Sequence, residues 1–376
     1  MKKLIYFDFV GTYGGAQQST STLLNFISKE YSINATVYYV NNTNKLFLDS
    51  LLINKEKIDF SFFSNFDIFK IRKKYIQAFI YLLICFVFLI VKNNNNSIFM
   101  CNSPKALLLL CLLKFFKKIE VHYYCRGWGV MDSFHPFIRF LLNKVVDKVY
   151  VVSESTSVNL SKFICLKKIF VTYTSVDLES IKLKKNEKLN IWFPKDKIKI
   201  VFAGAIIKTK GLHTLLESIN LLPEKMQKKY IIYIAGNFDK NDDYYNYCNN
   251  IISTSSCKVL WLGWVNNVPS LIYNSDIVCL PSYTEGLPRI IQEGMYLSKL
   301  CIATPVGGIQ DLIQHNKTGL LFNVEDYEYL SFLFSEIYSG GINIENLGVE
   351  AKKLIESKYT LKLQAQLFVN ALLSDI

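Results

Sequence analysis

The chain has 376 residues, of which 51% are hydrophobic and 20% are charged. This length exceeds one ordinary compact core and the apolar content excludes a disordered protein, so we expect two folded domains. The net charge of +12 arises before residue 171, where 22 Lys and Arg stand against 10 Asp and Glu, whereas the remainder holds 21 of each.

The first apolar run, residues 2–9, predicts a buried strand. Asp8 interrupts it and no small-residue cleavage site follows, so the run does not indicate a signal peptide, and we expect cytosolic synthesis. Further runs at 35–40, 97–102, 119–125, 148–153 and 169–174 also predict strands. Helix-length segments separate most of them, and this alternation is typical of a parallel, doubly wound sheet.

Glycines follow the first strand at Gly11, Gly14 and Gly15, ahead of a predicted helix over 18–28. Glycine lets the backbone approach a ligand closely, and a helix N-terminus favours anions. A plain strand-to-helix turn explains the same residues equally well.

Residues 75–91 form an apolar segment in which Gln77 is the only amide or charged side chain, with Arg72, Lys73 and Lys74 before it. We interpret it as a crossover helix of the first domain, because α/β patterning continues on both sides. Such a helix is either fully buried or pressed into a membrane interface; a true membrane span is the third alternative. The basic first half predicts an anionic partner, which could be a membrane surface, nucleic acid or an acidic substrate; the alternative is that much of the excess charge is a solvated surface.

Nine cysteines are scattered without a C-x-x-C pair, which indicates free thiols rather than a metal site. Residues 175–197 are charged and weakly periodic, so they predict a linker between a first domain over 1–174 and a second over 198–354. Strands of the second domain are predicted at 198–204, 230–236, 258–263, 276–282 and 300–306.

Three loops of the second domain follow strands and precede helices. The first contains Gly204 and then Lys208, Lys210 and Gly211. A lysine beside a glycine at a helix N-terminus can anchor a diphosphate, although a solvated loop lysine is an equally good interpretation of Lys210 alone.

The second loop, 281–288, contains Glu285 and leads into a helix carrying Glu293. Pro288 suits the first position of that helix, so the backbone N–H groups of Gly286 and Leu287 are expected to be free at its start. Carboxylates can accept two or more hydrogen bonds from sugar hydroxyls. The third loop, 303–309, again places glycines between a strand and a helix. Because ligands of open parallel sheets bind at the carboxyl ends of the strands, the three loops together predict an anion site there.

The motifs carry a family resemblance. SYTEGLPRIIQEGM resembles the E-x7-E region of glycosyltransferase family 4 (glycosyl transferases group 1), TPVGGIQDLI with KTGLLF resembles the segment after it, and Gly204 with Lys210 and Gly211 resembles the family's phosphate motif. The resemblance covers nearly the whole chain and is strongest over 200–325. It implies a GT-B fold: two Rossmann-like, doubly wound parallel-sheet domains facing across a cleft, with a C-terminal helix at about 355–376 packing back on the first domain.

The resemblance also implies roles for single residues. Glu285 would contact donor-sugar hydroxyls, Glu293 would hold the ribose, and Lys210 would neutralise the departing diphosphate. Backbone amides near Gly286 and Leu287, and those of Gly14 and Gly15, would complete the donor site. The enzyme would transfer sugar from a UDP- or GDP-type donor with retention, without cofactor or metal, and the absence of a D-x-D motif agrees with this.

Two positions depart from the family pattern. The family's arginine after the glycine is Ala205 here, which removes half of a cationic clamp unless Lys208 substitutes for it. Arg126 occupies the place of a histidine near the reacting sugar, where it would bind the donor's phosphate or an acidic acceptor. His122 lies earlier and is expected to pack within the strand.

We therefore expect a retaining glycosyltransferase that acts on a saccharide or lipid-linked acceptor in bacterial surface polysaccharide or lipopolysaccharide synthesis. It would be cytoplasmic or peripheral on the inner face of the plasma membrane. The alternatives are a sugar-nucleotide epimerase of the same fold and a catalytically silent partner subunit, which Ala205 and Arg126 favour. Nucleic-acid binding has no recognisable module to support it.

Overall fold

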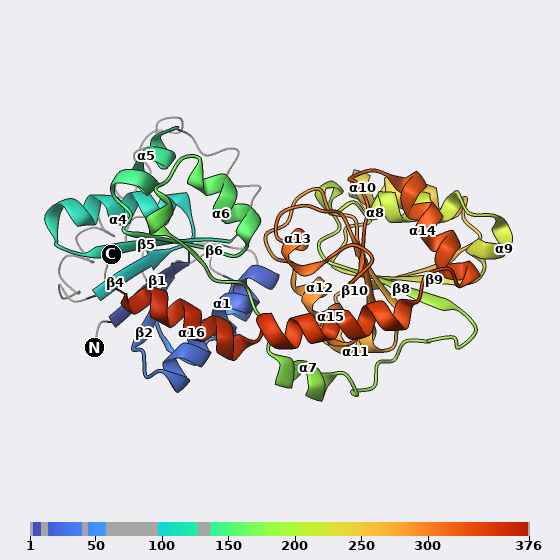
Figure 1. Ribbon diagram of the computed structural model, residues 1–376, viewed down its shortest axis with the longest axis horizontal. Helices are drawn as coiled ribbons and strands as arrows, with labels where there is room; N and C mark the ends of the chain where they lie inside the picture. Colours follow the sequence, from blue (N-terminus) through green and yellow to red (C-terminus); the bar gives the residue numbers. More distant parts are fainter. Residues whose placement is uncertain (1–2, 9–13, 40–43, 58–96, 127–135, 375–376) are drawn as a thin grey trace. The chain divides into compact units, whose positions relative to one another are not determined.

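The computed structural model describes residues 3–8, 14–39, 44–57, 97–126 and 136–374 (Figure 1). Gly11 and the apolar segment 75–91 lie outside the described residues. The described chain divides into two compact units. The first contains the residues up to Arg126, then 136–173 and the tail from Gln364; the second contains Thr174–Leu363.

The first unit is built on a parallel sheet whose strand order is β3-β2-β1-β4-β5-β6-β7. All six strands predicted for this half are present. Their bounds are β1 (Lys3–Asp8), β2 (Ala35–Tyr39), β4 (Ser97–Cys101), β5 (Glu120–Cys125), β6 (Lys148–Val151) and β7 (Ile169–Val171), joined by an unpredicted edge strand, β3 (Asn54–Lys57). The order reverses between β1 and β4, so the switch point of this sheet lies between these two strands.

Two helices of the first unit, α4 and α6, begin after serine capping residues. Ser103 and Ser153 each accept a hydrogen bond from a backbone N–H in the first turn of the following helix. The helices are α1 (Gly15–Glu30), α2 (Lys45–Ser50), α4 (Pro104–Phe116), α5 (Pro136–Lys144), α6 (Glu154–Ser161) and the short η2 (Leu166–Lys168).

The second unit repeats this topology with the order β10-β9-β8-β11-β12-β13, again all parallel. Its five predicted strands are present, and the two-residue β13 is additional. The bounds are β8 (Ile198–Ala203), β9 (Tyr230–Ala235), β10 (Lys258–Gly263), β11 (Ile277–Leu280), β12 (Leu300–Ala303) and β13 (Leu320–Leu321). Here the switch point lies between β8 and β11.

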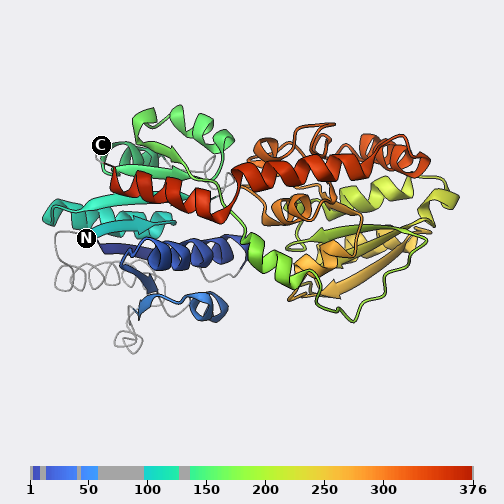
Figure 2. The same cartoon turned by 60° about the horizontal axis from the view of Figure 1, so that its bottom comes forward.

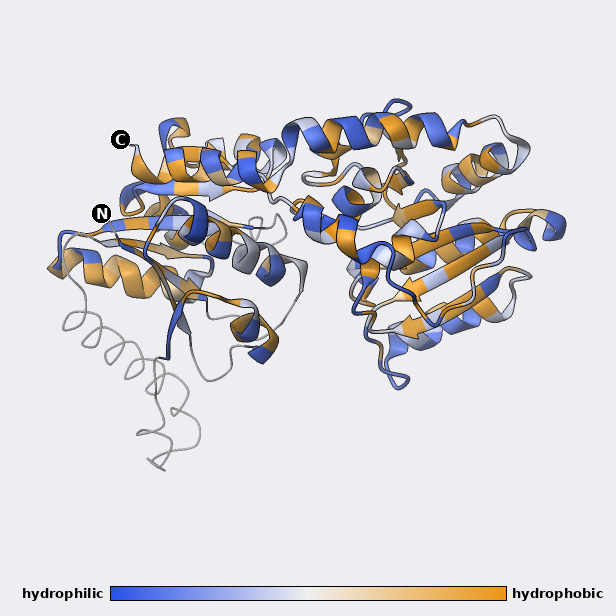
Figure 3. Ribbon diagram, turned by 90° about the horizontal axis from the view of Figure 1, so that it is seen from below, coloured by the Kyte–Doolittle hydropathy of each residue, from blue (hydrophilic) through white to orange (hydrophobic). Residues whose placement is uncertain are grey.

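Helices cover both faces of the second sheet. They are α7 (Leu178–Lys184), η3 (Lys208–Lys210), α8 (Leu212–Asn220), α9 (Glu224–Gln227), α10 (Asp243–Ser253), α11 (Val268–Tyr273), α12 (Arg289–Tyr296), α13 (Ile309–Leu312), α14 (Tyr327–Ser339), α15 (Ile344–Lys358) and the start of α16 (Leu361–Leu373). Figure 3 shows hydrophobic colouring along the strands, as expected for strands that are buried on both faces.

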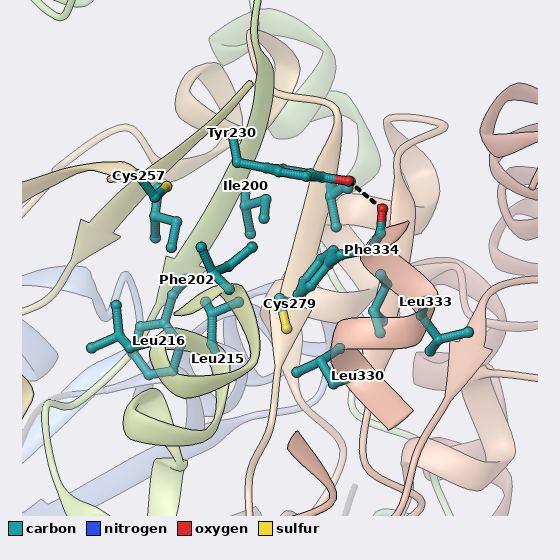
Figure 4. Close-up of a cluster of buried hydrophobic side chains, with 14 of the residues drawn as sticks. Ile200, Phe202, Leu215, Leu216, Tyr230, Cys257, Cys279, Leu330, Leu333 and Phe334 are labelled. Carbon is teal, nitrogen blue, oxygen red and sulfur yellow. Dashed lines mark hydrogen bonds between the residues drawn. The ribbon is translucent and has the colours of Figure 1, made fainter. Parts of the chain in front are cut away.

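The main core of the second unit lies between the sheet and α8, α10 and α14 (Figure 4). Phe202 and Phe334 are fully buried within it. Tyr230 is also buried, and its hydroxyl donates to the backbone oxygen of Phe334 at 2.5 Å, so its one polar group is satisfied. This packing fixes β8, which supports the first of the three loops.

The segment predicted as a linker, 175–197, is a packed part of the second unit. It contains α7, and its residues Leu189, Ile191 and Phe193 pack against the opposite face of the sheet. The Tyr233 hydroxyl donates to the backbone oxygen of Trp192 at 2.7 Å. Charged residues dominate this segment, so the prediction missed three apolar side chains at alternate positions. That spacing is typical of an extended chain that covers a sheet.

Helix α16 lies along the first sheet (Figures 1 and 2). Phe368 contacts the rings of Tyr124 and Tyr150, with centroids 6.0 Å and 5.0 Å apart. Lys148 is 1% exposed and donates from Nζ to the backbone oxygens of Ala371, at 2.7 Å, and Ser374. A buried ammonium bonded to carbonyls at a helix C-terminus compensates both the charge and the unpaired acceptors.

Two absences concern the described residues alone. No helix among them is long and apolar enough to cross a membrane. All eight cysteines among them are free, and seven are buried, as predicted, while Cys165 is exposed.

Candidate functional site

The three predicted loops meet at the carboxyl edge of the second sheet. They follow β8, β11 and β12, and backbone hydrogen bonds join them. Tyr283 N–H donates to the oxygen of Thr209 at 2.9 Å, and Gly308 N–H donates to the oxygen of Gly286 at 2.6 Å. The first two loops flank the switch point between β8 and β11, where open parallel sheets bind ligands.

Glycines permit this close approach of the loops. Gly211 has φ +68°, and a Cβ there would lie 1.9 Å from the backbone oxygen of Pro281. Gly307 has φ +53°, and its Cβ would lie 1.8 Å from the backbone oxygen of Glu285. Gly204, in contrast, has open space where a side chain would stand. The glycines therefore lock the loops together while leaving backbone accessible beside Gly204.

Lys210 and Glu285 form an ion pair, with Nζ and Oε1 2.5 Å apart. The Ser282 hydroxyl donates to the same Oε1 at 2.7 Å. The Glu285 side chain is only 9% exposed and that of Lys210 is 26% exposed. The predicted phosphate anchor and the predicted sugar carboxylate are thus in direct contact, although 75 residues separate them.

Glu293 lies one turn into α12, and its side chain is 9% exposed. Arg289, one helical turn earlier, donates from Nη2 to Glu293 Oε1 at 3.2 Å. Pro288 is the N-cap of α12 and supplies no side-chain hydrogen bond, and Gly286 and Leu287 precede it. The helix therefore presents its N-terminus at the loop that holds Glu285.

A hydrogen-bonded chain of side chains, which sequence reasoning missed, supports the loops. Tyr283 donates to Oε1 of Glu325, His213 Nε2 lies 3.0 Å from the Tyr283 hydroxyl, and His213 Nδ1 lies 2.9 Å from that of Tyr244. The pattern is consistent with a neutral imidazole protonated on Nε2. No spacing in the sequence signals it, because its members come from four separate segments.

Glu325 adds conformational strain to this network. Its φ of +62° lies in the left-handed region, which a residue with a Cβ adopts at a cost. The hydrogen bond from Tyr283 compensates for part of that cost. Burial, together with the hydrogen bond to Glu325, raises the pKa of Tyr283, so the hydroxyl remains a donor at neutral pH.

We predict that the network makes the second unit sensitive to acid through His213. Burial lowers its pKa below the usual 6.5, an effect that the nearby Glu217 and Glu325 oppose and Lys208 reinforces. As the pH falls through 6.5, the unfolded chain therefore takes up a proton that the folded chain refuses, and the free energy of unfolding falls. Urea denaturation at pH 7.5 and 5.5 should show this loss, at most about 1.4 kcal/mol per pH unit for one group. His213→Gln should flatten the dependence; an equal slope in the variant would contradict the assignment.

The remaining predicted residues lie in the first unit. Gly14 is the N-cap of α1, Gly15 is the first residue of that helix, and a Cβ on Gly14 would meet open space. Arg126 follows β5 directly and is half-buried. His122 is fully buried, with Nδ1 3.3 Å from the Tyr150 hydroxyl, which confirms that it packs within the sheet.

Ala205 and Lys208, the positions that bear on the incomplete cationic clamp, are both exposed. Lys208 is the first residue of η3, the same turn that ends in Lys210. The turn thus carries two cations, of which Lys210 pairs with Glu285.

Comparisons with known proteins agree with this architecture. A family model described as glycosyl transferases group 1 matches residues 184–354. The capsular polysaccharide biosynthesis glycosyltransferase CapM of Staphylococcus aureus is 24% identical over 281 residues, 70% of this chain and 73% of that protein. A Campylobacter jejuni protein named GalNAc-alpha-(1->4)-GalNAc-alpha-(1->3)-diNAcBac-PP-undecaprenol alpha-1,4-N-acetyl-D-galactosaminyltransferase is 26% identical over 191 residues, 50% of each chain.

Among solved structures, HepE of Anabaena in complex with UDP and glucose superimposes with a TM-score of 0.78 at 17% identity, covering 100% of both chains. At that identity the likeness shows the fold. The topology of the two sheets and the matched family model lead to one conclusion: this chain has the GT-B fold, and its residues 184–354 match the glycosyl transferases group 1 family.

Proposed function

We propose that this chain transfers a sugar from a nucleoside diphosphate sugar to a saccharide or lipid-linked acceptor, with retention of configuration and without a metal. The observation that carries the proposal is the contact of Lys210 with Glu285 where three glycine loops meet. One similar structure holds UDP and glucose, which supports a UDP-type donor; a GDP-type donor is the other candidate.

Each residue has a role that its position allows. Lys210 binds the diphosphate, Glu285 accepts hydrogen bonds from sugar hydroxyls, and Glu293 accepts them from the ribose. The backbone beside Gly204 admits phosphate, because no side chain occupies that space. Amides of Gly286 and Leu287 are proposed to complete these contacts in the second unit. In the first unit Gly14 and Gly15 start α1, whose N-terminus favours anions, and their amides are proposed as a further anion contact.

The ion pair explains how Lys210 and Glu285 can serve different parts of one donor. Without donor, Lys210 neutralises Glu285. When a diphosphate provides a stronger anionic partner, Lys210 can turn to it, while Glu285 keeps its hydrogen bond from Ser282 and gains sugar hydroxyls as donors. The Glu285 carboxylate therefore always has at least one hydrogen-bond partner. For this reason the movement of Lys210 to the diphosphate has a small free-energy cost.

In the proposed reaction the bond between the anomeric carbon and the diphosphate oxygen breaks, and the acceptor oxygen bonds to that carbon on the same face. The acceptor's proton passes to the departing diphosphate oxygen. Negative charge grows on the leaving group, so a preorganised cation such as Lys210 stabilises the transition state more than the bound substrate.

We propose a bacterial surface polysaccharide or lipopolysaccharide as the product, because CapM is named for capsular polysaccharide biosynthesis and the Campylobacter relative for an undecaprenol-linked acceptor. The enzyme would be cytoplasmic and peripheral on the inner face of the plasma membrane. The end of α4 supports membrane contact: Phe115 and Phe116 are 80% and 69% exposed, and Lys117 and Lys118 follow them.

The membrane proposal predicts that the double substitution F115S/F116S weakens flotation with anionic phosphatidylglycerol vesicles about tenfold or more, since each inserted ring leaves water. Leu183→Ser is the matched control, because Leu183 is 76% exposed but lies on α7 in the second unit. Equal binding of the double variant and the parent protein would argue against contact through α4.

The donor site is tested by the melting temperature of the full chain against a panel of nucleoside diphosphates and nucleotide sugars. A ligand at about 100 times its dissociation constant adds roughly 2.7 kcal/mol to stability. One base series should stabilise the parent and Lys228→Met, but not Lys210→Met. Lys228 forms an equally short ion pair with Glu224 on the exposed surface, 2.5 Å long, and so controls for loss of a lysine.

A catalytically silent partner subunit is the second candidate, because exposed Ala205 stands where the family has a cation and Arg126 stands where it has a histidine. If no nucleotide stabilises the chain at millimolar concentration with membrane lipid present, this candidate replaces the first. Measured transfer to an acceptor, with the anomeric configuration read by NMR, would exclude it and test retention.

A further inference from the structure

Polar side chains gather on one face of the first sheet, at its carboxyl edge. Phe7 pairs with Cys101, and Cys101 pairs with Tyr123, so the next residues, Asp8, Asn102 and Tyr124, lie side by side. Paired residues of a parallel sheet point to the same face, and Arg126 returns to that face two positions after Tyr124. Three neighbouring strands, β1, β4 and β5, thus bring a carboxylate, an amide and a guanidinium together.

Three polar atoms of Arg126 and Asn102 have no hydrogen-bond partner among the described residues. They are Nε and Nη1 of Arg126 and Oδ1 of Asn102, and all three are buried. Asn102 does use its other amide atom, since Nδ2 donates to Oδ2 of Asp8 at 3.1 Å. Native proteins satisfy nearly all buried polar atoms, so a cluster of unsatisfied ones at a sheet edge indicates groups that a ligand completes.

Among the described residues, Arg126 contacts an aromatic ring and no carboxylate. Its guanidinium carbon lies 5.0 Å from the centroid of the Tyr124 ring, which provides a cation–π contact. Within the described part of the chain no carboxylate lies within ion-pair distance of it. Nε and Nη1 of the guanidinium are buried, and a partly desolvated cation without a counter-ion is unfavourable.

We infer that this edge binds an acidic sugar that forms part of the acceptor. Arg126 holds the carboxylate of that sugar, and Asn102 and Asp8 accept hydrogen bonds from its hydroxyls. The inference rests on the proposed function and names the acceptor class for it. Arg126 and Asn102 are only half-buried, so a ligand can reach them from the carboxyl edge. Planar guanidinium groups bind carboxylates through two parallel hydrogen bonds, which gives recognition as well as attraction.

The acceptor atoms distinguish a sugar acid from a bare phosphate. Asn102 Oδ1 needs a donor, and a fully ionised phosphate has none to give. Asp8 lies on the same face and is fully buried. Burial raises the pKa of the nearby Tyr6 hydroxyl. The Asp8 carboxylate raises this pKa further, and the Arg126 guanidinium lowers it in part. A ligand that places a hydroxyl beside Asn102 Oδ1 and a carboxylate beside Arg126 satisfies both groups.

The test is isothermal titration of the full chain at about 50 mM salt with methyl glucuronide and methyl galacturonide, each against its neutral hexoside. We expect at least one acid to bind about tenfold or more tightly than its neutral counterpart. Arg126→Gln should remove the difference, Arg126→Lys should restore part of it, and Lys210→Met should leave it intact. Since Lys210 belongs to the second unit and to the proposed donor site, failure of donor binding and failure of this site are separate results.

A second measurement needs no variant. Phenylglyoxal modification mapped by mass spectrometry should label Arg126, and the preferred acid, but not its hexoside, should protect it. Equal binding of acids and hexosides overturns the inference. A preference for the acid that persists in an Arg126→Gln variant with the parent's melting temperature overturns it as well. Binding of farnesyl diphosphate that depends on Arg126, without binding of either acid, would also overturn it and assign the edge to a lipid diphosphate.

Discussion

Replacing Lys210 with Met should lower the turnover number about 10²–10³-fold, the usual cost of removing one preorganised group that stabilises developing charge. Binding of the donor should weaken as well, by about 1.5–3 kcal/mol for a lost charge-assisted contact to phosphate. The larger effect should fall on turnover, because negative charge on the diphosphate is greatest as it departs. Initial rates with the donor identified by the thermal panel measure both quantities.

Stability should change little in this variant. The Lys210 side chain is 26% exposed, and Glu285 keeps the hydrogen bond from Ser282. Lys228→Met should match the parent in rate, since its ion pair with Glu224 lies on the exposed surface. Lys208→Met is informative in a different way: a loss comparable with that of Lys210→Met would assign the missing family cation to Lys208. Near-parental turnover in Lys210→Met would remove Lys210 from the mechanism.

Gly211→Ala should lower the free energy of unfolding of the second unit by at least about 3 kcal/mol. Part of the cost, about 1–2 kcal/mol, comes from placing a Cβ at φ +68°. The rest comes from the backbone oxygen of Pro281, 1.9 Å from the new Cβ, which cannot retreat without separating the first loop from the second. Donor binding should fall together with stability, because Lys210 is the adjacent residue.

Gly340→Ala is the matched control for this experiment. Gly340 also has a left-handed conformation, φ +80°, but nothing lies within 4 Å of the Cβ position. It should therefore cost only the conformational term, about 1–2 kcal/mol. Urea denaturation followed by tryptophan fluorescence reports mainly on the second unit, because three of the chain's four tryptophans, Trp192, Trp261 and Trp264, lie in it. If the two alanine variants are equally stable, the loops are not locked at Gly211.

The sequence predicted most of the strands because buried parallel strands are continuous apolar runs, and all eleven such runs are strands. Two strands escaped this signal. The β3 sequence, NKEK, is polar and largely exposed at the sheet edge, and β13 has two residues. Residues 175–197 were predicted to be a linker because they are rich in lysine. Three alternating apolar residues of this segment pack on the second sheet, so it belongs to the second unit.

For the site, the motifs predicted three glycine loops that carry Lys210, Glu285 and Glu293, since loop chemistry is local in sequence. The motifs did not predict that Lys210 and Glu285 form an ion pair, nor the chain from Tyr244 through His213 and Tyr283 to Glu325. Contacts between residues tens of positions apart depend on which strands are neighbours, and a single sequence does not encode that order in any local pattern.

The sequence by itself thus determined the fold class, the two-unit plan and the residue types at the second sheet's edge, because hydrophobic period and turn chemistry act within a few residues. The tertiary structure alone decided the reversal of strand order between β8 and β11, which brings the loops after those strands together. It also decided that Asn102 and Arg126 share one face with unsatisfied polar atoms. Such features arise from parallel register across strands, a long-range relation that is set only when the whole sheet has assembled.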